Sequence, residues 1–392
     1  MKRLGLMVLM VFLFSCAGSS QQAQQAIEPD PLEDIDPLPP APPPVVEPEE
    51  PAVTQELEPL PSPYEEEEEE ETQVIASGPE MWEEYQNERR FDCVGPFDKL
   101  PAPYDFQLKG RTASIEGYTM KVSDPDWGAQ KSLKIGIMGA TKDSYPETLG
   151  NLRRFIRWFE EHKVSVVVIN GDIGYESRDM VKSMELLART RLLVLVMAGN
   201  ADPVSGFNRV LKETSAKWPN LVNANFVRRV EVDGHTLISL PGYYDSEFVN
   251  AGSGCQYYRS DVKSLGRLLD EAEGAPVVFS HGPPRGRGKR DIDFAFDAGN
   301  VGDKRLGDFL KKRRVPFGVF GHILECGGRA VNATSRKPVK PETWSPSLFV
   351  NTGGASSLLA DLHDGTSHRG MAGILEVEGN RAQVRWDYLP AD

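Results

Sequence analysis

Four polar residues of this chain follow apolar, β-branched runs, and their types are those of a metal centre. They are Asp172 in N-G-D, Asn200 in G-N-A-D, His281 in H-G-P and His322 in G-H-I-L. Glycines beside them allow the sharp turns that hold a side chain at a sheet edge. Because ligands of open α/β sheets bind beyond the carboxyl ends of the strands, we expect the four side chains to converge. Their oxygen and imidazole donors suit Mn, Fe or Zn better than Mg or Ca.

The elements that must position these residues alternate between strand and helix. The pattern predicts strands at 133–138, 164–169 and 192–197 and helices at 146–162, 176–190 and 203–218. Such alternation indicates right-handed βαβ units. The second half predicts strands at 226–232, 235–240, 276–280, 316–320, 348–351, 371–377 and 382–388, and helices at 260–273 and 302–313. Two sheets covered by helices suit this mixture.

The ordered set of strand-end residues resembles the calcineurin-like metallophosphoesterases. That family carries D-x-H, G-D, G-N-H-D/E, a lone H and G-H-x-H, each after a strand. The resemblance spans residues 133–351 and includes the late Asn-Gly turn at Asn351. It implies an α/β fold, a four-layer αββα sandwich of two mixed sheets, and hydrolysis of phosphoester bonds at a pair of metal ions.

Several motif positions depart from the family pattern. Ala140 and Lys142 stand where the first motif has Asp and His, Ala201 replaces the His of the third motif, and Leu324 replaces the last His. The resemblance therefore implies one metal site that is kept, made of Asp172, Asn200, His281 and His322. The second site, which shares Asp172, is lost. The expected cofactor is one divalent ion, Mn, Fe or Zn, or none.

Three further side chains could contact a phosphate. Lys142 could place its ammonium near Asp172, where the lost metal leaves a buried negative charge; the alternative is a solvated loop lysine. Arg285 and Arg287 follow His281 closely and could hold an anionic phosphate, as arginine forks do, or form a solvated basic loop. Cys326 could be a soft ligand, a disulfide partner or a buried thiol.

The first 130 residues predict export. Residues 1–16 resemble a lipoprotein signal peptide with lipidation at Cys16, the alternative being an ordinary signal peptide cleaved nearby. Residues 17–78 contain no Lys or Arg, are rich in proline and acidic residues, and predict a disordered stalk. Residues 79–130 are expected to be an irregular extension with a hairpin within 104–123, and residues 131–392 the metallophosphoesterase-like domain. Cys93, Cys255 and Cys326 allow one intrachain disulfide, in any of three pairings.

These observations lead to two functional hypotheses. The first is a membrane-anchored protein of the cell envelope, an outer-membrane lipoprotein facing the periplasm or the surface, with weak or absent phosphoester hydrolysis. The second is a non-catalytic module that binds an envelope protein partner through the altered cleft. The net charge of −14 comes from the stalk and does not describe the folded part. A phosphoester or anionic ligand is expected, and no nucleic acid, because no aromatic and basic residues interleave.

Overall fold

The computed structural model describes residues 77–108, 110–123, 132–190, 192–250 and 252–391. The predicted signal segment, Cys16 and all but the last two residues of the predicted stalk lie outside these ranges, so those predictions stay predictions. None of the helices within the described ranges has the length and apolar character needed to cross a bilayer.

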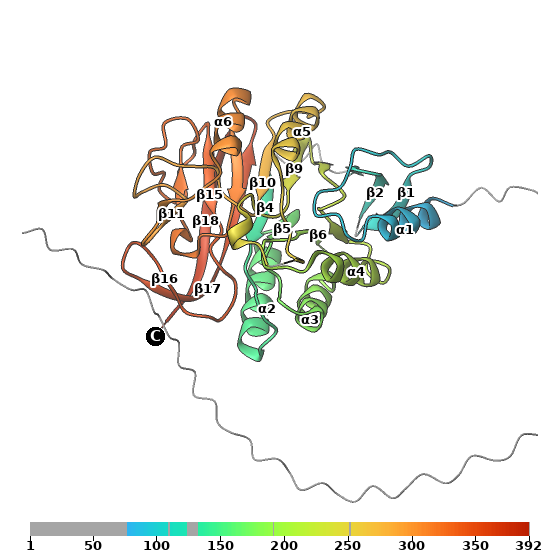
Figure 1. Cartoon of the computed structure of the whole chain (residues 1–392), viewed down its shortest axis with the longest axis horizontal. Helices are drawn as coiled ribbons and strands as arrows, with labels where there is room; N and C mark the ends of the chain where they lie inside the picture. Colours follow the sequence, from blue (N-terminus) through green and yellow to red (C-terminus); the bar gives the residue numbers. More distant parts are fainter. Residues whose placement is uncertain (1–76, 109, 124–131, 191, 251, 392) are drawn as a thin grey trace, which may run out of the picture. The chain divides into compact units, whose positions relative to one another are not determined.

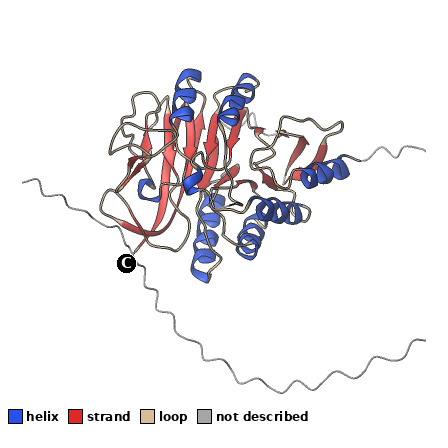
Figure 2. Ribbon diagram, in the orientation of Figure 1, coloured by secondary structure: helices blue, strands red, loops and turns tan. Residues whose placement is uncertain are grey.

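Most strands belong to two sheets, which share a core of buried residues, and Figure 2 shows the strands lying between helices. Within the described residues, the nine-stranded sheet has the order β1 (Tyr104–Leu108), β2 (Arg111–Glu116), β3 (Thr119–Ser123), β8 (Arg229–Val232), β9 (His235–Leu240), β10 (Val277–Ser280), β13 (Phe317–Phe320), β15 (Leu348–Asn351), β14 (Ala330–Val331). The seven-stranded sheet has the order β16 (Ala360–Asp361), β17 (Ser367–Glu378), β4 (Leu133–Met138), β5 (Val166–Asn170), β6 (Leu193–Met197), β7 (Leu221–Asn223), with β18 (Arg381–Pro390) paired to β17. A short hairpin pairs β11 (Phe294–Ala295) with β12 (Gly299–Asn300).

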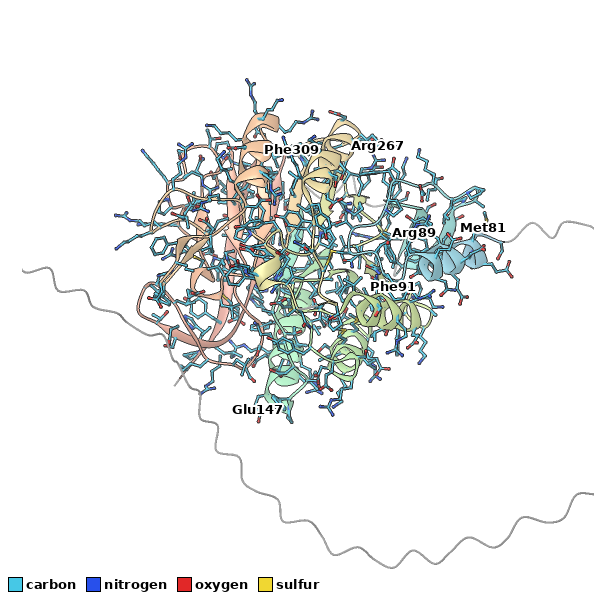
Figure 3. The ribbon with its side chains drawn as sticks, in the orientation of Figure 1. Met81, Arg89, Phe91, Glu147, Arg267 and Phe309 are labelled. Carbon is cyan, nitrogen blue, oxygen red and sulfur yellow. A yellow bond between two sulfur atoms is a disulfide. The ribbon has the colours of Figure 1, made fainter. Side chains whose placement is uncertain are left out.

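Helices cover the outer faces of both sheets (Figure 1). The helices are α1 (Gly78–Glu88), α2 (Pro146–Glu161), α3 (Ser177–Ala188), α4 (Val204–Ser215), α5 (Arg259–Asp270) and α6 (Lys304–Arg313), with 3₁₀ turns η2 (Ser246–Phe248) and η3 (Leu324–Cys326). Helices α2, α3 and α4 pack on the seven-stranded sheet, and α5 and α6 on the nine-stranded sheet. Phe309 of α6 lies beside Gly266 of α5 (Figure 3). The predicted four-layer αββα sandwich is confirmed.

Strand β5 explains why the central runs read as continuously apolar. Val166 and Val168 point into the core between the two sheets, whereas Val167 and Ile169 point into the core under the helices. Successive strand residues face opposite sides, so a strand buried on both faces has no polar position. Strands β4, β5 and β6 run parallel, as do β9, β10, β13 and β15. The carboxyl ends of each parallel set therefore meet at one edge of its sheet.

The described part of the segment 79–130 is more regular than we expected. It contains α1 and a three-stranded antiparallel meander, whose last strand β3 pairs parallel with β8 and so extends the nine-stranded sheet. Two signals account for the difference. Ser77 and Glu80 form a capping box with Pro79 in the first turn of α1. In β1 and β2 every second residue is buried, so these strands have one core face and one exposed face.

Candidate metal centre

Asp172 follows the carboxyl end of β5 and is buried. Its turn uses the left-handed backbone at Gly171 (φ 86°) and at Asp172 itself (φ 56°). A Cβ at position 171 would lie 2.5 Å from Nδ1 of His281, so glycine is what lets the imidazole approach. The backbone N–H of Ala201 donates to Oδ1 of Asp172 at 3.2 Å. The carboxylate is therefore held facing the turn after β6.

Asn200, in that turn, joins the two predicted histidines. Its Oδ1 lies 2.7 Å from Nε2 of His281 and 2.8 Å from Nδ1 of His322. Its Nδ2 donates to the carbonyl of Phe248 at 2.5 Å, which fixes the end of the amide that faces the histidines. The three side chains thus converge from the ends of β6, β10 and β13, as the sequence predicts.

The protonation of His281 shows what this cluster could hold. Its Nδ1 lies 2.8 Å from the carbonyl of Asn170, which can only accept, so Nδ1 carries the hydrogen. In the neutral ring Nε2 is then an electron-pair donor. Yet Nε2 faces two oxygens, Oδ1 of Asn200 at 2.7 Å and Oδ1 of Asp172 at 3.4 Å. Three electron-pair donors facing one another need a cation, either a second proton on His281 or a metal ion. Imidazole, amide and carboxylate donors fit Mn, Fe or Zn.

The spacing of the cluster is that of hydrogen bonds. Two ligands bonded at about 2.1 Å to one ion lie about 3.0–3.4 Å apart, whereas the two contacts of Asn200 are 2.7 and 2.8 Å. The described part of the chain contains no group of three or more His, Cys, Asp or Glu placed to hold a metal ion. Asp172, His281 and His322 therefore do not by themselves form such a group, and Asn200 lies between the two histidines. Binding an ion would require the side chains to separate by a few tenths of an ångström.

Burial and neighbouring charges set the protonation of these groups. Burial would raise the pKa of Asp172, but His281 and Lys142 hold it below its usual value of 3.8. Burial, reinforced by His281, lowers the pKa of His322 to about 3, so this ring is neutral at neutral pH and can act as a ligand. Burial and the carboxylate of Asp172 raise the pKa of Asp202 to about 7, against the effect of three backbone N–H donors.

The loop that follows β4, residues 139–145, places a lysine against Asp172; we call it the first-motif loop. Ala140 and Lys142 both have left-handed backbone, with φ of 48° and 60°. Their backbone N–H groups donate to the carbonyls of Gly171 and Asp172 at 2.8 and 2.9 Å, so the two loops run side by side. Nζ of Lys142 then lies 3.7 Å from Oδ2 of Asp172, and the lysine side chain is only 20% exposed.

The third-motif turn keeps Asp202 for a structural reason. Its Oδ1 accepts from the backbone N–H groups of Ile173 and Gly174 at 2.7 and 3.0 Å, and its Oδ2 accepts from Gly199 at 2.7 Å. Asp202 therefore ties the turn after β5 to the turn after β6. Ala201, between Asn200 and Asp202, contributes its backbone N–H to the site and no side-chain chemistry.

Sequence reasoning missed an aromatic support of His322. The buried ring of Tyr243 stacks on the imidazole with centroids 3.9 Å apart, and Phe248 approaches it edge-on at 6.4 Å. Tyr243 follows β9 as L-P-G-Y-Y, another glycine turn after an apolar strand. The same strand-end rule that found Asp172 could therefore have found Tyr243.

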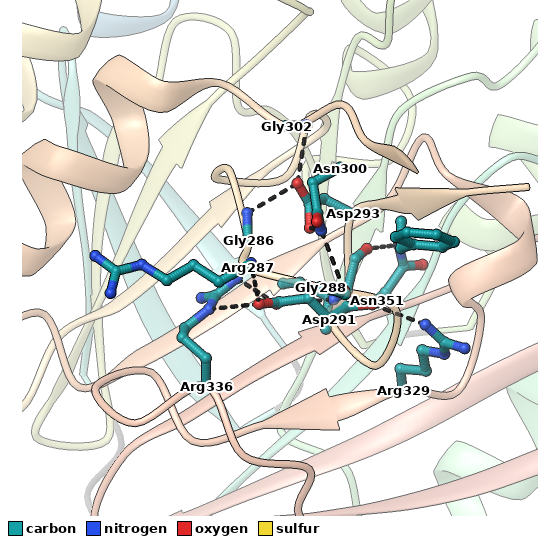
Figure 4. A network of polar contacts seen from close by, with 12 residues as sticks. Gly286, Arg287, Gly288, Asp291, Asp293, Asn300, Gly302, Arg329, Arg336 and Asn351 are labelled. Atoms are coloured by element: carbon teal, nitrogen blue, oxygen red, sulfur yellow. Dashed lines mark hydrogen bonds and ion pairs between the residues drawn. The ribbon is translucent and has the colours of Figure 1, made fainter. Parts of the chain in front are cut away.

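The structure places Arg285 and Arg287 beside α6. They line a cavity of about 640 Å³ to which Asp172, Asn200, His281 and His322 do not contribute. Figure 4 shows the network that fixes their loop. In it the backbone N–H of Gly286 donates to Asp293 and that of Arg287 to Asp291.

Late polar residues and the cysteines have structural roles. Asn351 donates to the carbonyls of Ile292, Gly321 and Ile323, so the late Asn-Gly turn fastens the loops after β10 and β13 (Figure 4). Of the three cysteine pairings left open by the sequence, the structure forms Cys93–Cys255. Cys326 is a buried thiol, and burial raises its pKa to about 12.

Comparison with known proteins identifies the family of this chain. The family model for calcineurin-like phosphoesterases matches residues 126–326, and the chain belongs to this family. Its members generally bind divalent metal ions. No curated protein matches the chain in sequence.

Solved structures resemble the chain only distantly. The protein TT1561 of Thermus thermophilus is 14% identical, with a TM-score of 0.43 and coverage of 63% of this chain and 98% of that one. Purple acid phosphatase PPD1 from yellow lupin (Lupinus luteus) is 9% identical, with a TM-score of 0.45 and coverage of 71% and 56%. A dimetal phosphatase from Danio rerio is 12% identical, with a TM-score of 0.40 and coverage of 66% and 99%.

Proposed function

We propose that this phosphoesterase-family chain holds one divalent metal ion through Asp172, Asn200, His281 and His322, and hydrolyses phosphoesters weakly or not at all. The proposal is carried by Nε2 of His281, which faces one oxygen of Asn200 and one of Asp172. Because the ring hydrogen is on Nδ1, Nε2 has no hydrogen to donate to either oxygen. When bound, the ion would supply Lewis-acid polarisation of a phosphoryl oxygen.

The residues around the kept site explain the low activity that we propose. Hydrolysis at paired metal ions needs a second ion about 3.5–4 Å from the first, and the positions of Ala140, Lys142 and Leu324 offer it no ligand. The methyl group of Ala201 can neither bind a phosphate nor donate a proton. Losing one such acid or donor alone lowers the rate by about 10²–10⁴.

Lys142 takes over part of the role of the missing ion in this proposal. Its ammonium lies 3.7 Å from Asp172 and compensates one of the charges that a dication would neutralise. It can also attract the phosphate of a ligand, but it cannot position a water molecule between two metal ions. The loop that carries Lys142 thus keeps a positive charge beside Asp172 but does not supply the catalytic function of a second metal ion.

Metal content of the full chain tests the proposal. After loading with Mn²⁺ and desalting, elemental analysis should find about one ion per chain, and His162→Ala, which alters a histidine remote from the cluster, should retain it. A phosphodiester substrate that releases a dye should be hydrolysed at least about 10²-fold more slowly than by a phosphoesterase with two metal ions. No bound ion together with no turnover would favour the alternative, a non-catalytic envelope module that binds a protein partner.

We also propose that the chain is exported and anchored in the outer membrane through a lipid on Cys16. The Cys93–Cys255 disulfide supports export, because such bonds persist in oxidising compartments. Metabolic labelling with a radioactive fatty acid should mark the parent chain and leave Cys16→Ser unmarked. A labelled Cys16→Ser protein would contradict the anchor, and a chain that stays in the cytoplasm would contradict export.

A further inference from the structure

A cavity of about 640 Å³ runs along α6, away from the candidate metal centre. We call it the α6 cavity; its walls are the loop 284–287, α6, the turn 333–336 and the segment before β15. Neither Lys142 nor any proposed metal ligand lines it. Its volume lies in the range of small-molecule sites, about 300–1,000 Å³.

The α6 cavity is strongly basic. Its charged lining consists of one carboxylate, Asp308, and six cations: Arg285, Arg287, Lys304, Lys311, Arg314 and Arg336. Lys304 pairs with Asp308 at 2.7 Å, and Arg336 pairs with the buried Asp291. Within the described ranges, the side chains of the other four cations form no ion pair or hydrogen bond. The cavity therefore carries an excess of about four positive charges.

The four uncompensated cations come from two segments, which separates this cluster from an ordinary helix end. Lys311 lies in the last turn of α6 and Arg314 caps it, where cations stabilise the helix dipole. Arg285 and Arg287 come from the loop after β10, which gains nothing from that dipole. The pKa of Asp308 is lowered by its hydrogen bond to Lys304, and Lys311 and Arg287 add to this effect. Cations from both segments thus act on one point of the cavity.

The wall that presents Arg285 and Arg287 is rigid. The backbone N–H of Arg285 donates to the carbonyl of Asp303 at 3.0 Å, and that of Arg287 to Oδ2 of Asp291 at 2.9 Å. A Cβ at Gly286 would lie 2.3 Å from atoms of Asp291 and Asp293, so this glycine serves close packing. Figure 4 shows the Arg287 side chain extending away from this network. The fixed loop keeps Arg285 and Arg287 near the cations of α6, so an anion bound between them would relieve their mutual repulsion.

We propose that the α6 cavity is a binding site for a ligand that carries two or more phosphate groups, separate from the metal centre. Guanidinium groups bind phosphate through paired N–H donors. Two phosphates, each with a charge of about −1.5 to −2, would match the four uncompensated cations. The cavity suits a compact ligand or a lipid headgroup better than a long polymer. The proposal does not depend on the kept metal site.

Calorimetry with inorganic tripolyphosphate tests the site. The titration uses the full chain with Cys16→Ser, without divalent metal, so that neither a lipid nor the metal centre contributes. The double variant Arg285→Gln/Arg287→Gln should bind at least about tenfold more weakly. Lys312→Gln is the matched control, because Lys312 lies in the same helix but does not line the cavity. His281→Ala should bind as the parent does.

Three outcomes would overturn the proposal. They are no binding by the parent, equal weakening by Lys312→Gln, and loss of binding in His281→Ala, which would move the phosphate to the metal centre. Sedimentation with vesicles of phosphatidylcholine and cardiolipin, a lipid whose headgroup carries two phosphates, identifies the source of the phosphate. Arginine-dependent binding to these vesicles supports a lipid headgroup, and binding of tripolyphosphate alone supports a soluble ligand.

Discussion

On one side of Asp172 lie Asn200, His281 and His322, joined by contacts of 2.7 and 2.8 Å and supported by the stacked ring of Tyr243. On the other side the first-motif loop brings Lys142, at 3.7 Å, in the only ion pair that this loop makes within the described residues. The first side has several electron-pair donors that face one another, whereas the second has only the ammonium group of one lysine. In our proposal one metal site is kept and the other is lost, and this difference is consistent with it, because each side of Asp172 is positioned by its own loops.

The largest expected effect is that of breaking the Cys93–Cys255 disulfide, which lies next to the side of Asp172 that carries the histidines. Cys255 lies beside Tyr243, whose N–H donates to the Cys255 carbonyl at 3.1 Å. The disulfide closes a loop with a sequence separation of 162, for which chain entropy predicts a stabilisation of about 5 kcal/mol. Denaturant unfolding with and without reductant should show a loss of this order.

Cys326→Ala is the control for that experiment, since its thiol forms no disulfide. The response to reductant should be the same in this variant as in the parent. Identical unfolding curves for oxidised and reduced parent would mean that the bond does not support the fold.

The next effect is on metal affinity. His281→Ala removes the ring that faces both Asn200 and Asp172, so affinity for Mn²⁺ should fall at least about 100-fold. Lys142→Met should leave at least the parent affinity, because it removes a competing cation. Metal titration followed by electron paramagnetic resonance measures both. Equal losses of Mn²⁺ affinity in the two variants would contradict the difference between the two sides of Asp172.

Asp202 should matter for stability through its three N–H partners. In Asp202→Asn the amide NH₂ must face the N–H of Gly199, which leaves a buried donor unsatisfied and costs about 1–3 kcal/mol. Thermal unfolding compares it with Asp297→Asn, whose side chain is exposed and should be neutral. A stable Asp202→Asn protein would show that the two turns hold together without this clamp.

The smallest effect is expected from Lys142→Met in metal-free protein. The lowered pKa of Asp172 contributes stability above its unfolded-state value of about 4, and this contribution disappears as the pH falls through the folded-state pKa. The variant should lose about 1 kcal/mol at neutral pH, and the difference should vanish in acid.

Lys163→Met is the control, because Lys163 shares the left-handed backbone but is exposed. Chemical denaturation across pH measures both variants. A pH-independent loss in Lys142→Met would assign the lysine a packing role only.

The sequence predicted the central strands and the convergence of the four strand-end residues, because both follow from local rules: buried strands are apolar, and polar residues after them share one edge. Within 104–123 it predicted only a hairpin and not the three-stranded meander, whose last strand β3 pairs with the distant β8. It also did not place Arg285 and Arg287, because the course of their loop depends on Asp291, Asp293 and Arg336. Such tertiary contacts leave no periodic signal.

The Cys93–Cys255 bond also has a mechanical consequence. A force that pulls on the two ends of the chain passes through the disulfide and bypasses residues 94–254. Asp172 and Asn200 lie inside this shielded segment, whereas His281 and His322 lie in the part that bears the load. Tension would therefore draw the histidines away from the carboxylate and the amide before it extended the strands that carry the latter two.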